Sequence, residues 1–267
     1  MRLSEHQTHS GRFLFRWRSY LPLALLPVFA LSLADYRYPL GSPRLGLAWE
    51  IGCLAVALVG LAIRGAVAGT VPAGTSGRNM SAQQAEALNT TGIYSVVRHP
   101  LYLANYLIFL GLALLPFTWY LPVIVTLSAA LYYERIILVE EEFLDQRYGE
   151  AFRSWAARTP AVIPQSKGWV TSSLPFSWRI ALKGEIYAAF AIVAGVFAID
   201  LVERSLVERE LRMDPVWTAL FAAGAVAFYV VRGLKKKHVA ADGGGEAMSR
   251  RRGRTLGEAT DYLAEAA

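Results

Sequence analysis

The sequence predicts an all-helical, polytopic integral membrane protein, and three observations support this fold class. Hydrophobic residues make up 54% of the 267-residue chain, whereas a soluble domain usually contains about 45–50%. These residues are concentrated in blocks, and a helix that crosses a bilayer needs roughly 20 mainly apolar residues. When the chain is threaded alternately through a membrane, 22 of its 27 Lys and Arg residues fall on one side. That bias is the one that the positive-inside rule requires.

Six blocks are predicted to cross the membrane: 21–34, 46–63, 101–115, 120–133, 186–201 and 216–231. The first block carries a Ser32-Leu33-Ala34 sequence and could instead be a cleaved signal peptide. The third and fourth blocks flank a predicted tight turn at 116–119, so we expect them to form a helical hairpin. Asp214 and Pro215 supply an N-cap and a first-turn proline for the sixth block.

The remaining segments complete a topology of about six helices with both termini in the cytoplasm. Residues 69–91 are rich in Gly, Ser, Thr and Ala and predict a loop, and residues 141–157 predict an amphipathic cytoplasmic helix. We divide the chain into an N-terminal tail with the first helix (1–45), a membrane core (46–165), two further helices (166–239) and a disordered basic tail (240–267). The composition, and the lack of eukaryotic sorting signals, favour a bacterial inner membrane.

Composition also excludes several classes of site. A single cysteine, Cys53, cannot form an intramolecular disulfide or a Cys-clustered metal centre. The four histidines are too scattered along the chain to predict a metal site. The net charge of +6 is explained by topology and by attraction to anionic lipid. We therefore expect the lipid bilayer as a partner, with no nucleic acid and no metal.

The most informative local pattern lies at the start of the third membrane block. Proline suits the first turn of a helix, so Pro100 places Arg98 and His99 beside free backbone N–H groups at a helix N-terminus. Such a position favours a carboxylate or phosphate. Tyr102 shares a helix face with His99, and Tyr106 continues that face. The pattern predicts an anion site with aromatic walls.

An acidic run, Glu140 to Glu142, ends the following membrane block, and the register favours the first two of these glutamates over the third. Because the two blocks form a hairpin, the acidic run meets Arg98 and His99 at the membrane boundary. An anion site, aromatic faces and carboxylates suit a ligand that carries a carboxylate, a cation and hydroxyl groups. S-adenosylmethionine is such a ligand, because a sulfonium can face aromatic rings.

Two motifs then appear in order along the chain: Gly92-x-Tyr94-x-x-x-Arg98-His99-Pro100-x-Tyr102 and Glu140-Glu141-x-x-Leu144-x-x-x-Tyr148-Gly149. Together they resemble the isoprenylcysteine carboxyl methyltransferase and phospholipid methyltransferase superfamily, over about residues 46–165. The resemblance implies an integral-membrane enzyme that uses S-adenosylmethionine as its cofactor. It also implies a cofactor pocket lined by Leu88, Tyr94, His99, Pro100, Leu101 and Tyr102 and closed by Glu140. The isoprenylcysteine enzymes place an arginine four residues before the matching glutamate, where this chain has Ile136, with Arg135 one residue away.

For catalysis we single out Arg98, His99, Glu141 and Arg135. An amine acceptor would lose a proton to a carboxylate such as Glu141 or Glu134, whereas an ionised acceptor would be positioned by Arg98 or Arg135. We expect the 141–157 helix and the 69–91 loop to shield the cofactor from water.

The leading hypothesis is methyl transfer to an amphiphilic, lipid-like or prenylated acceptor. A phospholipid N-methyltransferase and a small-thiol S-methyltransferase are alternatives within the same chemistry. A sterol-reductase-like or non-catalytic membrane relative is a second class, and a structural membrane scaffold is a third.

Overall fold

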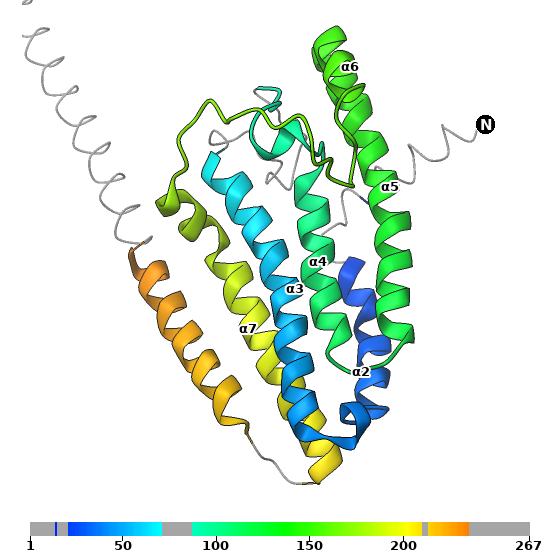
Figure 1. Ribbon diagram of the computed structural model, residues 1–267, viewed down its shortest axis with the longest axis vertical. Helices are drawn as coiled ribbons and strands as arrows, with labels where there is room; N and C mark the ends of the chain where they lie inside the picture. The colour runs from blue at the N-terminus through cyan, green and yellow to red at the C-terminus, as the bar shows by residue number, and fades with distance from the viewer. Residues whose placement is uncertain (1–13, 15–20, 71–86, 210–212, 235–267) are drawn as a thin grey trace, which may run out of the picture.

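The computed structural model describes residue 14 and residues 21–70, 87–209 and 213–234. Within these ranges every regular element is a helix, as the sequence predicts. In chain order they are η1 (Leu21–Leu25), α2 (Leu26–Ala34), η2 (Pro39–Gly41), α3 (Pro43–Thr70), η3 (Ile93–Ser95), α4 (Pro100–Leu114), α5 (Tyr120–Tyr148), α6 (Glu150–Ala156), α7 (Trp178–Glu208) and a last helix, Pro215–Leu234. The longer helices run alternately up and down a single bundle (Figure 1).

Four of the described helices are long and apolar enough to cross a membrane: Pro43–Thr70, Tyr120–Tyr148, Trp178–Leu206 and Pro215–Leu234. Helix α4 is apolar but has only 15 residues, and α2 has nine. The expected number of six spans is therefore not confirmed, although the polytopic helical fold is. Large apolar side chains remain exposed on these helices, among them Ile51, Leu58, Leu127, Leu131, Leu182 and Val226. An apolar exterior of this kind is typical of an integral membrane protein.

Local chemistry accounts for the ends of the helices. The turn between α4 and α5 lies where it was predicted, and Phe117 adopts a left-handed conformation there (φ 53°). Gly149 ends α5 with φ 52°, a conformation that glycine adopts at little cost. The Ser177 hydroxyl accepts from the Ile180 amide at the start of α7. Asp214 caps the last helix as predicted, because its carboxylate accepts from the Val216 amide at 2.8 Å.

Helices α3 and α4 pack at close range through small residues. A Cβ atom placed on Gly111 would lie 2.7 Å from the backbone oxygen of Cys53 and 2.9 Å from the Ala57 side chain. A Cβ on Gly60 would meet the backbone oxygen of Ala104. Small residues allow the backbones of membrane helices to approach closely, and this contact holds the start of α4 beside the end of α3.

Two predicted segments differ from the structure. The expected separate helix over 141–157 is wrong in its boundaries, because α5 continues to Tyr148 and only Glu150–Ala156 forms a separate helix, α6. Nothing between the apolar part of α5 and Gly149 interrupts helical hydrogen bonding, so the acidic run extends the membrane helix. Helix α3 likewise continues to Thr70. Most of the predicted 69–91 loop, and the predicted tail from residue 240, lie outside the described residues.

Candidate functional site at one end of the hairpin

The backbone before α4 is held by a segment that follows α6. The Arg98 amide donates to the Pro160 carbonyl at 2.9 Å, and the His99 amide donates to the Ala161 carbonyl at 3.0 Å. The amides of Arg98 and His99 themselves are therefore not among the free backbone N–H groups expected at this helix N-terminus. Their hydrogen-bonding capacity is used by a segment about 60 residues further along the chain, which no local pattern could reveal.

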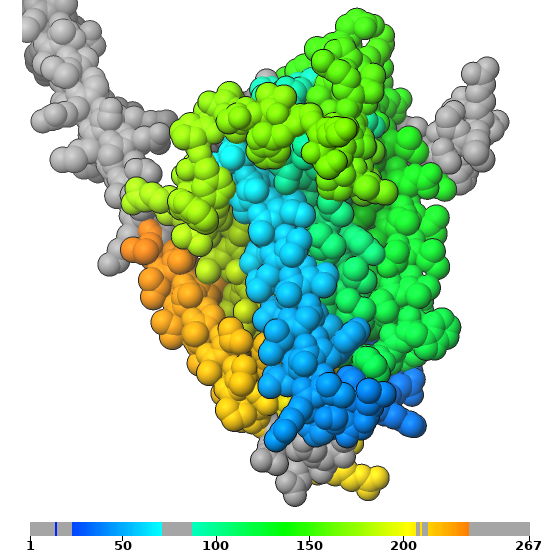
Figure 2. Space-filling view, viewed as in Figure 1, coloured from blue at the N-terminus to red at the C-terminus, as the bar shows by residue number. Residues whose placement is uncertain are grey.

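This segment, residues 159–170, is called here the strap. It lies across the end of the bundle in the space-filling view (Figure 2). The Gln165 amide donates to the Val96 carbonyl at 3.1 Å, and the Gly92 amide donates to the Val170 carbonyl at 2.7 Å. The strap is therefore hydrogen-bonded to the Gly92–His99 stretch along most of its length.

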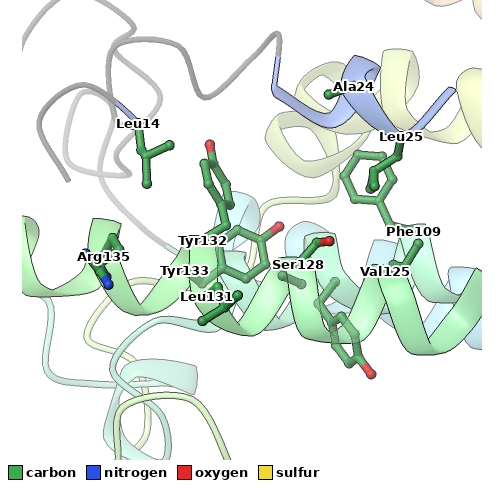
Figure 3. A pocket seen from close by; sticks show the side chains of 12 residues that line it. Leu14, Ala24, Leu25, Phe109, Val125, Ser128, Leu131, Tyr132, Tyr133 and Arg135 are labelled. Atoms are coloured by element: carbon green, nitrogen blue, oxygen red, sulfur yellow. The ribbon is translucent and has the colours of Figure 1, made fainter. Parts of the chain in front are cut away.

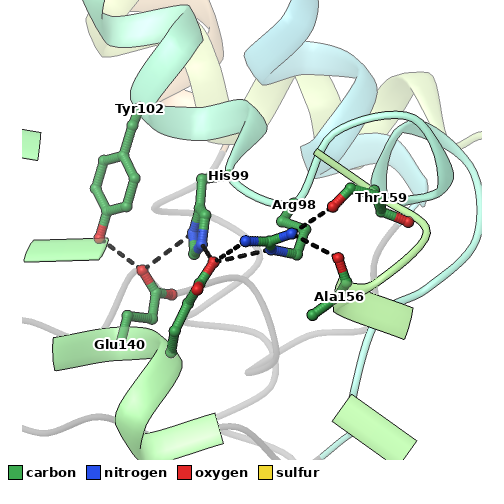
Figure 4. A network of polar contacts seen from close by, with 7 residues as sticks. Arg98, His99, Tyr102, Glu140, Ala156 and Thr159 are labelled. Carbon is green, nitrogen blue, oxygen red and sulfur yellow. Dashed lines mark hydrogen bonds and ion pairs between the residues drawn. The ribbon is translucent and has the colours of Figure 1, made fainter. Parts of the chain in front are cut away.

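The Arg98 side chain ties the strap to α5 (Figure 4). Its Nε and Nη2 atoms lie 2.8 and 2.7 Å from the Oε1 atom of Glu141. Its Nη1 atom donates to the carbonyls of Ala156, at 2.8 Å, and Thr159. The guanidinium is thus directed at protein acceptors on three sides. It was predicted to position an ionised acceptor, but in the structure its donors are engaged within the chain.

His99 lies between the two glutamates that the register favoured. Its Nε2 atom is 3.0 Å from Glu141 Oε1, and its Nδ1 atom is 3.5 Å from Glu140 Oε2. The Tyr102 hydroxyl donates to the same Glu140 oxygen at 2.8 Å. Glu142, the third member of the acidic run, is exposed. The structure therefore brings together Arg98, His99, Tyr102, Glu140 and Glu141 at one point (Figure 4).

The environment of His99 favours its charged form. Burial of the ring opposes protonation, but the hydrogen bonds and charges of Glu140 and Glu141 outweigh burial and raise the pKa of His99 above its ordinary value. An imidazolium can donate to a carboxylate from each ring nitrogen. His99 thus acts as a cationic link between two carboxylates that would otherwise repel each other.

Aromatic rings continue the site toward the interior of the bundle. The His99 ring stacks on Tyr102 with centroids 5.7 Å apart, and Tyr102 stacks on Tyr133 at 5.1 Å. Tyr133 lies about two helical turns before Glu140 on α5. Such stacked faces attract a cation through their electron-rich surfaces.

An apolar cavity of about 490 Å³ adjoins the far side of this stack. It runs along α5 and is bordered by Ala24 and Leu25 at the end of η1 and by α4 (Figure 3). Its lining includes Leu25, Phe109, Val125, Tyr132, Tyr133 and Arg135. Arg135, predicted as a catalytic candidate, therefore lies at this cavity and outside the His99 network. Tyr106 also lines it, and its hydroxyl is 3.1 Å from that of Thr126.

The other predicted pocket residues lie around the network. Pro100 is buried at the first position of α4, and Leu101 beside it is half-buried. Tyr94 lies in η3, where its carbonyl accepts from the Trp155 indole at 3.0 Å. Leu88 precedes η3 and is half-buried. These four residues stand close to the network in sequence, but they are not among the residues joined in Figure 4.

Sequence reasoning missed a second polar group near the site. Arg64 of α3 donates to Glu185 of α7 and to Asn105 of α4, in both cases at 2.6 Å. The predicted membrane blocks stopped beside both charged residues, at positions 63 and 186, so neither residue was placed within a membrane span. Their position inside long apolar helices was the signal that could have found them, because charges at membrane depth are functional candidates.

The fold and this site define a class: a helical membrane protein with a histidine and paired carboxylates at one end of a helical hairpin. Residues 50–151 match the model of the phospholipid methyltransferase family. This segment is therefore similar to that family, which lies within the superfamily that also contains the isoprenylcysteine carboxyl methyltransferases. The resemblance predicted from the two motifs is confirmed over these residues.

Two curated bacterial proteins are similar to the chain. The nickel-cobalt-cadmium resistance protein NccN of Alcaligenes xylosoxydans xylosoxydans is 32% identical over 117 residues, which are 44% of this chain and 54% of NccN. The cobalt-zinc-cadmium resistance protein CzcN of Cupriavidus metallidurans is 37% identical over 86 residues, which are 32% of this chain and 39% of CzcN. The similarity thus spans about half of these relatives or less. No solved structure matches the chain.

Proposed function

We propose that the chain is an integral-membrane methyltransferase that transfers a methyl group from S-adenosylmethionine to a lipid-like or prenylated acceptor. One observation carries the proposal: Arg98, His99, Glu140 and Glu141 converge inside the segment that matches the phospholipid methyltransferase family. When bound, S-adenosylmethionine supplies an electrophilic methyl group on a positively charged sulfur.

The residues present fit such a cofactor by their chemistry. The Glu140 side chain is 29% exposed, so its carboxylate can accept hydrogen bonds from an amine or from hydroxyl groups. The stacked rings of Tyr102 and Tyr133 offer faces for a cation. Leu88, Tyr94, Pro100 and Leu101 would complete the apolar part of the pocket, as the family resemblance implies.

The cavity beside Tyr133 supports an amphiphilic acceptor. Its lining is mainly apolar, with Arg135 as a charged residue at one end (Figure 3). An acyl or prenyl chain is the kind of group that such a lining accommodates, and Arg135 would then hold a polar head near the site. This arrangement favours a lipid-like acceptor over a small thiol.

The protein's own side chains would orient the reactants and accept a proton. Arg98 and the strap hold Glu141 in place, and His99 compensates the charge of both glutamates. A protonated amine acceptor must lose a proton before its nitrogen can attack the methyl group, and Glu140 or Glu141 can accept that proton. Alignment of acceptor and methyl donor, and exclusion of water by the strap, would supply the remainder of the rate enhancement.

The names of the two relatives refer to metal resistance, and a role for this chain in the same response is compatible with methyl transfer. Among the described residues, no group of three or more His, Cys, Asp or Glu side chains is placed to hold a metal ion. The proposed activity therefore rests on the family segment and the His99 network, and we propose no metal as a ligand.

We further propose that the site faces the cytoplasm of a bacterial cell, because that orientation places 22 of the 27 Lys and Arg residues inside. A reporter fused after Leu206 should then be exposed on the outer side. A cytoplasmic signal from that fusion would contradict the orientation.

The decisive experiment measures binding of S-adenosylmethionine by the purified protein in detergent. Wild type should bind saturably, and Glu140→Gln should weaken binding about tenfold or more, as expected when a charge-assisted hydrogen bond is lost. Glu142→Gln is the matched control, because Glu142 belongs to the same acidic run but is exposed; its affinity should stay within about twofold of wild type. His99→Ala tests the histidine in the same assay.

Tritium from the labelled methyl group should then appear in the lipid extract. Label in protein would point to a prenylated polypeptide, and label in a volatile fraction to a small thiol. Absence of saturable binding by the wild type would refute the methyltransferase proposal.

A further inference from the structure

An ion pair joins three helices below the His99 network. Arg64 Nε lies 2.6 Å from Glu185 Oε2, and Arg64 Nη1 donates to Asn105 Oδ1 at 2.6 Å. The side chains of Arg64 and Glu185 are 24% and 7% exposed. Arg64 lies about two turns before the end of α3, and Glu185 about two turns after the start of α7. All three residues therefore lie at a similar depth in the bundle.

A charge pair at this depth is weak evidence for stability, because desolvation of two ions offsets much of their attraction. Arg64 and Glu185 belong to helices that are long and apolar enough to cross a membrane, although α7 also carries Arg179 and Lys183 near Glu185. Charged residues in such surroundings are rare and serve a function by default.

The ion pair adjoins the candidate site. Asn105 follows Tyr102 by three residues on α4, so the two side chains share a face of that helix. Arg64 also interacts electrostatically with the hydroxyl of Tyr133, whose ring stacks on Tyr102. Its bond to Asn105 therefore places the Arg64 guanidinium on the face of α4 that also carries Tyr102.

Arg64 differs from Arg98 in how its donors are used. Arg98 directs nitrogens at Glu141 and at two backbone carbonyls. Arg64 uses Nε for Glu185 and Nη1 for Asn105, and its Nη2 group donates to no residue that the structure describes. A guanidinium has five N–H donors in a rigid fork. Fixing one edge with a carboxylate and an amide leaves the other edge in a defined orientation.

We propose that Arg64 is the anion-binding residue of this site, oriented by Glu185 and Asn105, and that it binds the carboxylate or phosphate group of a ligand. The proposal rests on the proposed function, and it replaces the helix N-terminus as the anion site. It also makes α7, which lies outside the matched residues 50–151, part of the site through Glu185.

The test uses the full chain in detergent and two pairs of probes. S-adenosylhomocysteine carries an amino-acid carboxylate, whereas 5′-methylthioadenosine keeps the nucleoside and thioether but lacks the amino acid. Dihexanoylphosphatidylglycerol carries a phosphate, whereas dihexanoylglycerol does not. Dissociation constants are measured for wild type, Arg64→Gln, Arg64→Lys and Glu185→Gln. Arg179→Gln is the control, because Arg179 is an exposed arginine near the start of α7.

We expect Arg64→Gln to weaken binding of one anionic probe about tenfold or more and to leave its uncharged partner within about twofold. Arg64→Lys should retain part of the affinity, because it keeps the charge but loses the fork. Glu185→Gln should weaken the same probe by a smaller factor. Loss for S-adenosylhomocysteine assigns Arg64 to the cofactor carboxylate, and loss for the phospholipid assigns it to the acceptor phosphate.

Three results would overturn the proposal. The first is unchanged affinity for both anionic probes in Arg64→Gln and Arg64→Lys. The second is equal loss for the charged and uncharged members of a pair, which would indicate a purely structural role. The third is failure of the wild type to bind either anion. If the wild type binds neither nucleoside probe, the proposed function fails, and the phospholipid pair still decides the role of Arg64.

Discussion

Replacing Arg98 by alanine should release the strap from the end of the bundle. The Arg98 side chain is 14% exposed and Glu141 is 23% exposed, so their ion pair is largely shielded from water. Breaking a buried pair costs about 3–5 kcal/mol, and the bonds to the Ala156 and Thr159 carbonyls are lost as well. With a discount for the exposed part of the pair, we expect a cost of about 3 kcal/mol. This corresponds to an increase on the order of 100-fold in the opening equilibrium.

Hydrogen exchange measured by mass spectrometry in detergent is the appropriate assay, because it reports opening of a local segment. Peptides that cover the strap and the start of α4 should lose protection in Arg98→Ala, and peptides from α7 should not. Arg158→Ala is the matched control, because the Arg158 side chain is exposed and, among the described residues, donates to Ser154 rather than to the strap. Unchanged strap protection in Arg98→Ala, or equal loss in the control, would refute the assignment of Arg98 to the strap.

Three further predictions concern the same region. Because the pKa of His99 is raised in the folded state, its contribution to stability should be complete below its ordinary pKa of about 6.5 and should decline as pH rises through the folded value. The difference in thermal unfolding midpoint between wild type and His99→Gln should shrink over the same pH range, and a constant difference would contradict this. Gly111→Leu should destabilise the protein by about 3 kcal/mol or prevent folding, because the new side chain would meet Cys53 of α3. Gly52→Leu should be tolerated, because there is open space at Gly52, and similar unfolding midpoints for the two variants would contradict the prediction. Tyr102→Phe keeps the stacked ring but loses the hydroxyl bond to a carboxylate, so it should lower the free energy of unfolding by about 1–2 kcal/mol. It should weaken cofactor binding less than Tyr102→Leu does, and equal effects of the two variants on binding would show that stacking is unimportant.

The pairing of the two motifs could be predicted because it depends on short-range rules. A proline in a first turn marks the start of α4, and a four-residue turn forces α5 back alongside it. The helical register then places Glu140 and Glu141, rather than Glu142, toward His99. Each step uses residues only a few positions apart, or two helices joined by a tight turn.

The anion site could not be predicted in the same way. Helix geometry predicts free amides in the first turn of α4, but it does not reveal that carbonyls of the strap accept from the amides of Arg98 and His99 just before that turn. The strap reaches them because α6 turns back at Gly149 and brings Pro160 and Ala161 over the end of the bundle. No periodicity in the sequence reports where a segment without regular structure will lie.

By itself, the sequence determined the apolar spans, the hairpin and the meeting of a histidine with two glutamates, because hydrophobic burial and helical periodicity act locally along the chain. Only the tertiary structure decided that Arg98 ties down the strap and that Arg64 pairs with Glu185, 121 residues away. Contacts of that kind depend on which helices lie side by side. In this bundle, which helices lie side by side depends on the close packing of small residues between α3 and α4, and on the free-energy cost of leaving a buried charge without a partner.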